Sequence, residues 1–276
     1  MSLEDAKTQV DLAFTRKDRR GLAYENAFGG ATSFLRRAYS KDVAAADLVV
    51  TGVPFDQAVT HRPGTRFGPR AIREASTLQP YDPPYGWDGF DPLGEFEIVD
   101  YGDMPFDYAN VACVPALIEE HIKTIINQGP ATVTLGGDHF ITLPILRAYA
   151  AKYGPMSVIQ FDAHSDLWAD DDMSRIDHGT FMYKAVKLGL VDVTRSVQIG
   201  IRTECDDYLG MPYIDAREVH EKGAAYVVDK VKKIVGDSPT YVTFDIDALD
   251  PAFAPGTGTP VWGGLASWET AAILRD

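Results

Sequence analysis

Three short apolar segments of this 276-residue chain each lead directly into aspartate and histidine side chains. The segments are residues 131–135, 156–161 and 241–244. The motifs that follow them directly are Gly-Gly-Asp-His, Asp-Ala-His-Ser-Asp and Asp-Ile-Asp, in this order. Short runs rich in Val, Ile, Thr and Phe predict buried β-strands. The carboxyl ends of parallel strands lie at one edge of a sheet, where ligands bind. We therefore expect a fold in which the three motifs meet at such an edge.

Predicted strands alternate with predicted helices along most of the chain. The strands are expected at 47–54, 96–103, 131–136, 156–161, 196–201 and 241–244. Apolar residues at helical spacing predict helices within 110–128, 181–188 and 227–235, one helix starting at Pro69, and a last helix capped by Ser267. Residues 79–94, rich in Pro, Gly and Asp, predict a long loop. This order is typical of a parallel sheet covered on both faces, folded as one domain over residues 46–276 behind a polar N-terminal arm, residues 1–45.

Composition narrows the range of partners. A formal net charge of −14 argues against nucleic acid or an anionic membrane and is compatible with a cationic substrate. The two cysteines, Cys113 and Cys205, have neither metal-binding nor redox spacing, which predicts two buried or free thiols in a reducing compartment. The sequence contains no signal-peptide pattern and no apolar run of about 18 residues, so we expect a cytoplasmic protein.

The aspartate and histidine motifs supply six candidate metal ligands. They are His139, Asp162, His164, Asp166, Asp245 and Asp247. If the segment 162–166 were fully extended, its two aspartates would lie roughly 13 Å apart, so it must curl past its strand or serve two ions. The two aspartates of 245–247 would project from one face of a strand, with Cα atoms roughly 6–7 Å apart. This spacing suits one terminal and one bridging ligand to a pair of ions.

Charge balance points to two metal ions. Four carboxylates that converge in a semi-buried site repel one another unless cations neutralise them, and two divalent ions balance four negative charges. The oxygen and nitrogen donors, without cysteine, favour Mn²⁺ over a softer metal and leave Zn²⁺ and Fe²⁺ open. Each motif alone has a simpler interpretation: a capping or salt-bridge pair at 245–247, a tight turn at 136–137, or a core histidine at 164. Together the three motifs indicate a hydrolytic metal site.

The same motifs resemble the signatures of the ureohydrolase family, which comprises arginases, agmatinases and related amidinohydrolases. The matching segments are Gly-Gly-Asp-His (136–139), Asp-Ala-His-Ser-Asp (162–166) and the run from Phe-Asp-Ile-Asp to Gly-Thr-Pro (244–260), in the family's order and spacing. Within the family, the sequence looks most like agmatinases at 177–180, 196–204 and 261–265. The resemblance covers about residues 45–276.

The resemblance implies a three-layer α/β/α fold with a mostly parallel central sheet, two Mn²⁺ ions per subunit, and a homo-oligomer, commonly a trimer or hexamer. It implies hydrolysis of agmatine to putrescine and urea, a step of polyamine biosynthesis, by attack of a metal-bridging hydroxide on the guanidinium carbon. By the family pattern, one ion is held by His139, Asp162, Asp166 and Asp245, and the other by Asp162, His164, Asp245 and Asp247. Asp166 is expected to orient the hydroxide. His178 matches the family's proton-shuttle position and is expected to protonate the leaving amine.

One departure from the family pattern leaves alternatives open. The pattern continues past residue 276 through a strand carrying a glutamate that grips the substrate guanidinium, and this sequence has no matching residue. We therefore expect the domain to be incomplete at its carboxyl end. Arg62, Arg66 and Arg70 fit a carboxylate-bearing substrate such as 4-guanidinobutyrate. The absent glutamate fits a non-catalytic subunit of the same fold.

Overall fold

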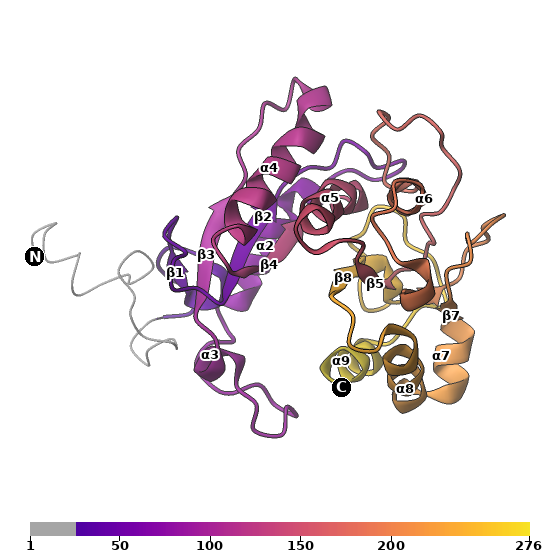
Figure 1. Ribbon diagram of the computed structural model, residues 1–276. Helices are drawn as coiled ribbons and strands as arrows, with labels where there is room; N and C mark the ends of the chain where they lie inside the picture. The colour runs from indigo at the N-terminus through magenta and orange to yellow at the C-terminus, as the bar shows by residue number, and fades with distance from the viewer. Residues whose placement is uncertain (1–25) are drawn as a thin grey trace, which may run out of the picture. The chain divides into compact units, whose positions relative to one another are not determined.

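The computed structural model describes residues 26–276, which fall into two compact units (Figure 1). Unit 1 comprises the described residues up to Phe55 together with Arg66–Gly137, and unit 2 comprises Asp56–Thr65 and Asp138–Asp276. Each unit contains a sheet of four parallel strands flanked by helices. The predicted α/β class with parallel strands is confirmed, and the strands are arranged as two four-stranded sheets.

Most of the predicted N-terminal arm, residues 1–25, lies outside the described residues. In the remainder, Phe34–Arg36 forms a 3₁₀ turn (η1), and Ala38–Tyr39 forms a short strand (β1). β1 pairs in parallel with β3 (Ile98–Asp103). This part of the arm therefore extends the sheet of unit 1.

The sheet of unit 1 has the strand order β1-β3-β2-β4. Its remaining strands are β2 (Leu48–Val53) and β4 (Ala131–Gly136). The helices that precede β4 in the chain are α2 (Gly68–Ser76), α3 (Pro92–Glu95) and α4 (Val114–Ile126). Two 3₁₀ turns, η2 (Thr65–Phe67) and η3 (Val111–Cys113), lie directly before α2 and α4. Successive residues of β2 face opposite sides. Val49 packs with Ile125 of α4, whereas Val50 packs with Leu93 of α3. Both faces of this sheet are therefore covered.

The sheet of unit 2 has the strand order β7-β6-β5-β8, and its pairings are parallel. The strands are β5 (Ser157–Phe161), β6 (Val197–Ile201), β7 (Tyr213–Asp215) and β8 (Thr240–Phe244). The helices are α5 (Thr142–Tyr153), α6 (Phe181–Lys187), α7 (Ala216–Lys222), α8 (Ala224–Val235) and α9 (Ser267–Arg275), with 3₁₀ turns η4 (His139–Ile141), η5 (Val193–Arg195) and η6 (Ile246–Ala248).

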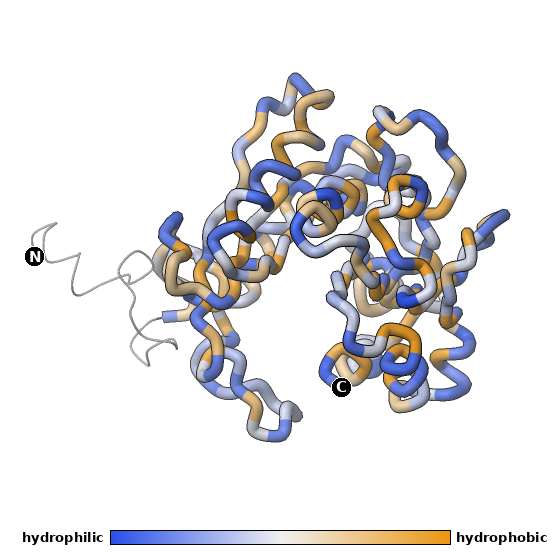
Figure 2. Tube along the Cα trace, viewed as in Figure 1, coloured by the Kyte–Doolittle hydropathy of each residue, from blue (hydrophilic) through white to orange (hydrophobic). Residues whose placement is uncertain are grey.

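Alternation along the strands also covers both faces of the second sheet. Phe161 and Ile199 belong to a buried apolar cluster with Val227 of α8 and residues of α7 and α9. α8 carries apolar and polar residues on different sides, as its mixed colours in Figure 2 show. On the other face, the ring of Tyr241 in β8 lies 5.9 Å from that of Tyr149 in α5. Residues adjacent to Phe161 and Ile199 in their strands therefore face away from α8.

The structure differs from the sequence-based expectations at several element boundaries. Ser267 is the first residue of α9, and Ala266 occupies the N-cap with an extended backbone, so the prediction of Ser267 as the cap is wrong by one position. The helix expected within 110–128 begins only at Val114, because the three preceding residues form a 3₁₀ turn. The loop expected at 79–94 ends in the short helix α3. The strand β7 and the helix α7 were not predicted.

Candidate metal centre

The parallel pairing of β5 with β8 brings two aspartates together. Phe161 and Phe244 are register partners at the ends of these strands, and Asp162 and Asp245 are the next residues. The N–H of Asp245 donates to the carbonyl oxygen of Phe161 at 2.9 Å, which continues the backbone contact past the strand end. The two carboxylates therefore leave the sheet side by side, at the carboxyl edge where the sequence predicts a site.

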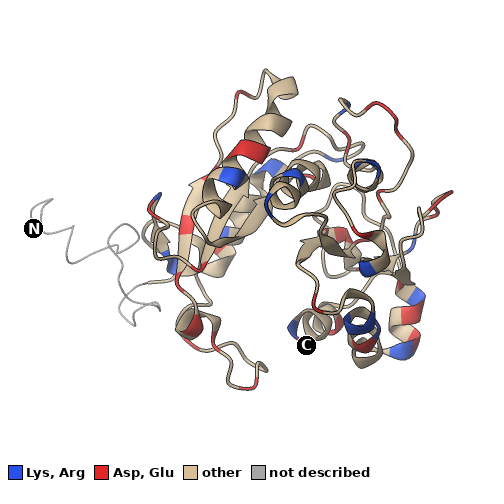
Figure 3. Ribbon diagram, in the orientation of Figure 1, with Lys and Arg blue, Asp and Glu red and all other residues tan. Residues whose placement is uncertain are grey.

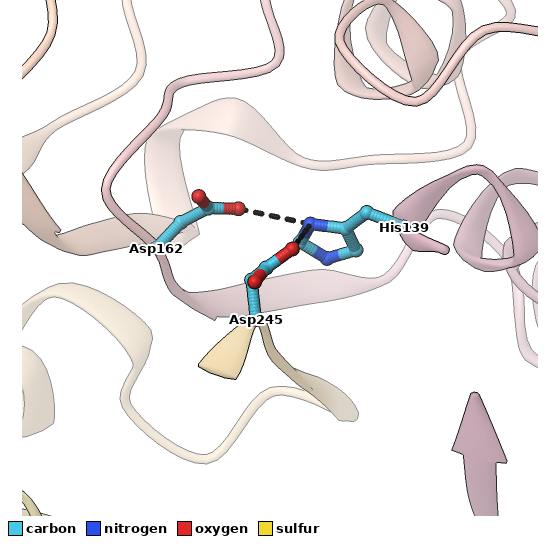
Figure 4. Close-up of side chains that lie close together, drawn as sticks. All are labelled: His139, Asp162 and Asp245. Atoms are coloured by element: carbon cyan, nitrogen blue, oxygen red, sulfur yellow. Dashed lines mark ion pairs between the residues drawn. The ribbon is translucent and has the colours of Figure 1, made fainter. Parts of the chain in front are cut away.

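His139 joins these carboxylates from the first position of η4. Its Nε2 lies 2.8 Å from Oγ1 of Thr243 in β8, which leaves Nδ1 for the carboxylates. The distances from Nδ1 are 2.9 Å to Oδ2 of Asp162, 3.1 Å to Oδ2 of Asp166 and 3.4 Å to Oδ2 of Asp245. Figure 4 shows this nitrogen directed at Asp162 and Asp245. Nδ1 is buried and forms no well-aligned hydrogen bond, and its place among three carboxylates suits a cation ligand.

His164 gathers a second group of oxygens. Its Nδ1 lies 3.0 Å from Oδ2 of Asp247 and 3.5 Å from Oδ1 of Asp162. The two oxygens of Asp162 thus face different imidazoles, with Oδ2 toward His139 and Oδ1 toward His164. Within the group of His139, Asp162 and Asp245, and within the group of Asp162, His164 and Asp247, the ligand atoms all lie within 4.8 Å of one another. Asp162 belongs to both groups.

Hydrogen bonds from side chain to backbone curl both ligand segments. Oδ1 of Asp162 accepts the N–H of His164 at 2.8 Å, and Asp166 has a φ of 53°, so this segment curls as expected. Oδ1 of Asp245 accepts the N–H of Asp247 at 2.9 Å and caps η6. The expectation that Asp245 and Asp247 share one face of a strand is therefore wrong. The aspartate cap turns the chain, and β8 ends before either residue.

Burial and neighbouring charge shift the pKa values of the cluster. Burial, together with neighbouring carboxylates, raises the pKa of Asp166 to about 7 and that of Asp247 to about 8. Burial also acts on Asp162, but hydrogen bonds from both imidazoles outweigh it and lower its pKa. Burial disfavours charged imidazoles, but the carboxylates outweigh it, so the pKa of His164 rises to about 10 and that of His139 rises well above its usual value. The cluster therefore retains protons that a bound cation would release.

The donor set fits two divalent ions. Ligand atoms at right angles around an ion, with bonds of about 2.1 Å, lie about 3 Å apart. The two imidazole nitrogens lie between 2.9 and 3.5 Å from their neighbouring carboxylate oxygens. Coordination through Nδ1 of His139 would leave the proton on Nε2, where Oγ1 of Thr243 accepts it. The carboxylate and imidazole donors, without thiolate, suit Mn²⁺ and similar ions.

His178 is positioned by the loop Asp56–Thr65. Its Nε2 accepts the backbone N–H of Thr60 at 3.2 Å and lies 2.9 Å from Oγ1 of the same residue. Asp177 accepts the N–H of Gly179 at 2.9 Å and so shapes the turn that holds the imidazole. Burial lowers the pKa of His178, and the charges of Asp177 and Asp245 oppose this shift. The imidazole is therefore neutral near pH 7.

The side chain of Asp138 connects this loop with η4. Its Oδ2 accepts the N–H of Ala58 at 2.9 Å, and its Oδ1 accepts the N–H of Phe140 at 3.1 Å. Burial raises the pKa of Asp138 to about 7, although both N–H donors oppose this rise. A single carboxyl group therefore positions both the loop beside His178 and the turn that begins with His139.

Arg202 holds the segment that begins with Asp247. Its Nη2 donates to the carbonyl oxygens of Asp247 at 2.6 Å and Val261 at 2.7 Å, and its Nη1 donates to that of Ala248 at 3.2 Å. Burial lowers the pKa of Arg202, and the charge of Asp247 opposes this effect. Because these bonds go to carbonyl oxygens, Arg202 fixes the loop without pairing with a ligand carboxylate.

The structure brings the six candidate ligands together and holds His178 beside the loop Asp56–Thr65. Four positioning residues were not identified from the sequence. They are Thr60, Asp138, Arg202 and Thr243. Thr60 and His178 are far apart in sequence, and only the fold makes them neighbours. Thr243 is a polar residue in a strand, and a buried polar position of this kind was a usable signal. Asp138 and Arg202 lie inside recognised motifs. Their side chains bind backbone groups, and this role leaves no periodic pattern in the sequence.

Comparisons with known proteins identify the family of this chain. Residues 46–276 match the Arginase family. The agmatinase of Chromobacterium violaceum is 46% identical over 275 residues, which cover 99% of this chain and 85% of that protein. The crystal structure of a hypothetical agmatinase from Burkholderia thailandensis is 51% identical with a TM-score of 0.93, over 96% of this chain and 84% of that one. Proclavaminate amidino hydrolase from Streptomyces clavuligerus is 36% identical with a TM-score of 0.84, over 91% and 85%. The chain belongs to the Arginase family, and the predicted resemblance is confirmed.

Proposed function

We propose that the protein hydrolyses agmatine to putrescine and urea. The observation that carries this proposal is the position of Asp162, whose two oxygens face two separate imidazole-containing donor groups. Such a shared carboxylate suits a two-metal hydrolase. Agmatine is supported as the substrate by the similarity to the agmatinase of Chromobacterium violaceum over 99% of this chain.

We infer that the cluster holds two Mn²⁺ ions. The proposed ligands are His139, Asp162, Asp166 and Asp245 for one ion, and Asp162, His164, Asp245 and Asp247 for the other. When bound, the pair supplies a nucleophilic water at neutral pH and stabilises the negative charge that develops during attack. The chain's own part is to orient these side chains, through the turns at both strand ends and the contact of Thr243 with His139.

Two side chains are assigned to the proton transfers of the reaction. A guanidinium carbon is a poor electrophile because its charge is delocalised over three nitrogens, and the departing amine must leave protonated. Asp166 lies on the His139 side of the cluster, where its carboxyl group would accept a hydrogen bond from the attacking water. Nε2 of His178 accepts the N–H of Thr60, so the neutral ring carries its proton on Nδ1. The ring would first take up a proton from solvent, and the resulting imidazolium would donate a proton to the departing amine and return to the neutral form.

The group at the end of the substrate opposite the guanidinium distinguishes agmatine from the alternative substrate, 4-guanidinobutyrate. Agmatine ends in an ammonium group, whereas 4-guanidinobutyrate ends in a carboxylate. The net charge of −14 favours a substrate with two positive ends. Arg62 is exposed in the loop Asp56–Thr65 of unit 2, and its positive charge favours a substrate that ends in a carboxylate.

Urea release tests the proposal. The purified, Mn²⁺-loaded chain is assayed with agmatine and with 4-guanidinobutyrate, and an EDTA-treated sample serves as the control. We expect metal-dependent urea release with a higher kcat/KM for agmatine. A preference for 4-guanidinobutyrate would replace the assigned substrate. No urea from a chain with two bound metals would favour the non-catalytic subunit.

A second assay tests the role of His178. We expect His178→Asn to lower kcat by about 10²- to 10⁴-fold, because the leaving amine loses its proton donor. Its bound Mn²⁺ should remain at the wild-type level, since His178 is not a proposed ligand. Wild-type kcat in this variant would assign proton transfer to another group.

We further propose a cytoplasmic homo-oligomer, a trimer or a hexamer, built from a single catalytic domain over residues 46–276. No nucleic-acid or membrane partner is expected, given the net charge of −14. Within residues 26–276, no helix has both the length and the apolar character needed to cross a membrane. Light scattering tests the assembly against the subunit mass of 30.3 kDa, and a monomer in solution would contradict it.

A further inference from the structure

Two buried glutamines lie next to the proposed metal ligands. Gln160 of β5 and Gln198 of β6 are register partners in neighbouring strands, and both are 0% exposed. They face away from the apolar cluster that contains Phe161 and Ile199. Burying two amides inside a sheet is unfavourable unless they form hydrogen bonds, so their partners indicate what they do.

The two amides form a chain that ends on a ligand carboxylate. Nε2 of Gln198 donates to Oε1 of Gln160 at 2.8 Å and to the carbonyl oxygen of Ser165 at 2.6 Å. Nε2 of Gln160 donates to Oδ2 of Asp162 at 2.8 Å, and at 3.3 Å to the carbonyl oxygen of His164. The acceptors outside the pair therefore all lie in the ligand segment that follows β5.

Chemistry fixes the orientation of both amides. If the Gln160 amide were reversed, its oxygen would face the Asp162 carboxylate and its nitrogen would face Nε2 of Gln198, so acceptor would meet acceptor and donor would meet donor. In the present orientation, Oε1 of Gln198 is buried without a hydrogen-bond partner. An unsatisfied buried acceptor is destabilising. The pair therefore keeps a donor on Asp162 at the expense of one acceptor elsewhere.

A neutral donor has a property that a charged one lacks. An arginine or lysine in this place would neutralise the carboxylate and compete with a metal ion for it. An amide N–H orients the oxygen and adds no charge. The bond goes to Oδ2 of Asp162, the oxygen that faces His139, and Oδ2 of Asp166 on the same side lies 3.5 Å from the same Nε2. The influence of Gln160 therefore falls on the His139 side.

We propose that Gln160, anchored by Gln198, is a positioning residue that fixes Asp162 for the ion on the His139 side. This inference rests on the proposed two-metal site. Outer-shell partners of metal ligands typically contribute 10- to 100-fold to metal affinity. Gln160 acts by setting the direction of the carboxylate lone pairs, and Gln198 acts by preventing rotation of the Gln160 amide.

Mn²⁺ titration of the metal-free 276-residue chain tests the inference. Gln160→Met removes the donor with little change in volume, and Gln198→Met removes the anchor. Val158→Ala, which shortens a buried apolar side chain of the same strand, is the matched control. We expect Gln160→Met to raise the Kd of one Mn²⁺ ion by about 10- to 100-fold and that of the other by less than about threefold. Gln198→Met should have a smaller effect of the same kind, and Val158→Ala should leave both Kd values unchanged.

Single-ion backgrounds identify which ion is affected. His164→Asn keeps the His139 side, and there Gln160→Met should weaken Mn²⁺ binding by about 10- to 100-fold. His139→Asn keeps the other side, and there the same substitution should have less than about a threefold effect. Equal weakening in both backgrounds overturns the inference. Unchanged affinities with a lowered Tm also overturn it, because the glutamines would then act only in the core.

Wild-type urea release from agmatine is measured on the same preparations. Failure of the proposed function would appear as no urea from the wild type. Failure of the inference would appear as unchanged affinities in Gln160→Met. The two failures are therefore distinguished.

Discussion

Buried aspartates of the two sheets have opposite kinds of partner. In unit 1, Asp100 of β3 is 0% exposed and receives Nε and Nη2 of Arg73 at 2.8 and 3.0 Å. In unit 2, Asp162 is 1% exposed, and its ion-pair partners within the described residues are the imidazoles of His139 and His164. Acidic residues appear both on β3 and in the neighbourhood of β5 and β8 (Figure 3). Among the described residues, Asp100 and Asp103 of β3 pair with the Arg73 guanidinium, whereas the ligand aspartates that follow β5 and β8 pair with no guanidinium.

The difference separates a structural acidic site from a metal-binding one. Arg73 is a permanent cation, and the N–H groups of Phe34 and Gly102 supply further donors to Asp100, so this site is complete without an ion. In unit 2, Arg202 lies close to the ligand loop but directs its hydrogen bonds to carbonyl oxygens. Arg202 therefore does not compete with an external cation for the ligand carboxylates.

The largest expected effect lies in unit 2. Asp162→Asn should lower activity by at least about 10³-fold and release metal from both donor groups, because the carboxylate is shared. The metal-free variant should unfold at a lower temperature than the metal-free wild type, because hydrogen bonds from both imidazoles lower the pKa of Asp162 and so stabilise the folded state. Urea release, metal content and thermal unfolding measure these quantities. Wild-type activity would refute the shared role.

The corresponding change in unit 1 should act on stability. Arg73→Met leaves the charge of Asp100 buried and unpaired, so the free energy of unfolding should fall by about 3–5 kcal/mol. Arg73→Lys should cost less, because it keeps the charge but loses the two-pronged contact. Urea denaturation measures both variants, with Arg73→Met/Asp100→Leu as the compensating control. A loss below about 1 kcal/mol in Arg73→Met would contradict the comparison.

Metal removal should affect the two sheets unequally. Mn²⁺ at 100 times its Kd stabilises the folded state by about 2.7 kcal/mol for each ion, and EDTA should remove this stabilisation. Hydrogen exchange should show slower exchange in β5 and β8 on adding Mn²⁺ and little change in β2 and β3. Equal protection of both sheets would show that the ions act on the whole chain rather than on unit 2.

The smallest expected effect concerns a histidine of unit 1. Nε2 of His121 in α4 lies 2.7 Å from Oγ1 of Thr51. Burial, and to a smaller extent the charge of Lys41, lowers the pKa of His121 to about 4. Between pH 6.5 and 4 the unfolded chain binds the extra proton, so the free energy of unfolding contributed by this group falls as the pH falls. The loss should be about 1–2 kcal/mol, because the ring is only partly buried.

His121→Gln measures this contribution. The variant should show a flatter dependence of unfolding free energy on pH between 6.5 and 4, determined by urea denaturation at several pH values. Thr51→Val is the matched control, because it removes the hydroxyl partner and keeps the imidazole. Identical slopes in His121→Gln and wild type would show that other groups control stability in this range.

Local pattern accounts for much of the fold. The apolar runs before Asp162 and Asp245 determine where β5 and β8 end, and the helices between strands require parallel pairing. The division into two sheets is not encoded locally, because β4 and β8 are similar short runs and nothing in either specifies its neighbour. The three-residue strand β7 is too short to produce a recognisable alternation.

The candidate site shows the same division between local and tertiary information. The ligand residues stand in motifs and were predicted, but the cap by Asp245 replaces the expected strand geometry with a turn. The contact between Thr60 and His178, and the glutamine pair, depend on segments that meet only in the folded chain. A glutamine within the apolar run of β5 was the visible signal, but its role follows from the strand beside it.

The route of the chain between the units has a consequence for recombination and fragment design. The loop Asp56–Thr65 belongs to unit 2 although both of its sequence neighbours belong to unit 1, so the described chain passes between the units after Phe55, Thr65 and Gly137. No single crossover in a gene would exchange one unit intact. A fragment that starts at Asp138 would carry all six candidate ligands and lack Thr60, the residue that holds His178. A chimera built from two relatives would need to inherit the ten-residue loop and the carboxyl-terminal segment from the same parent.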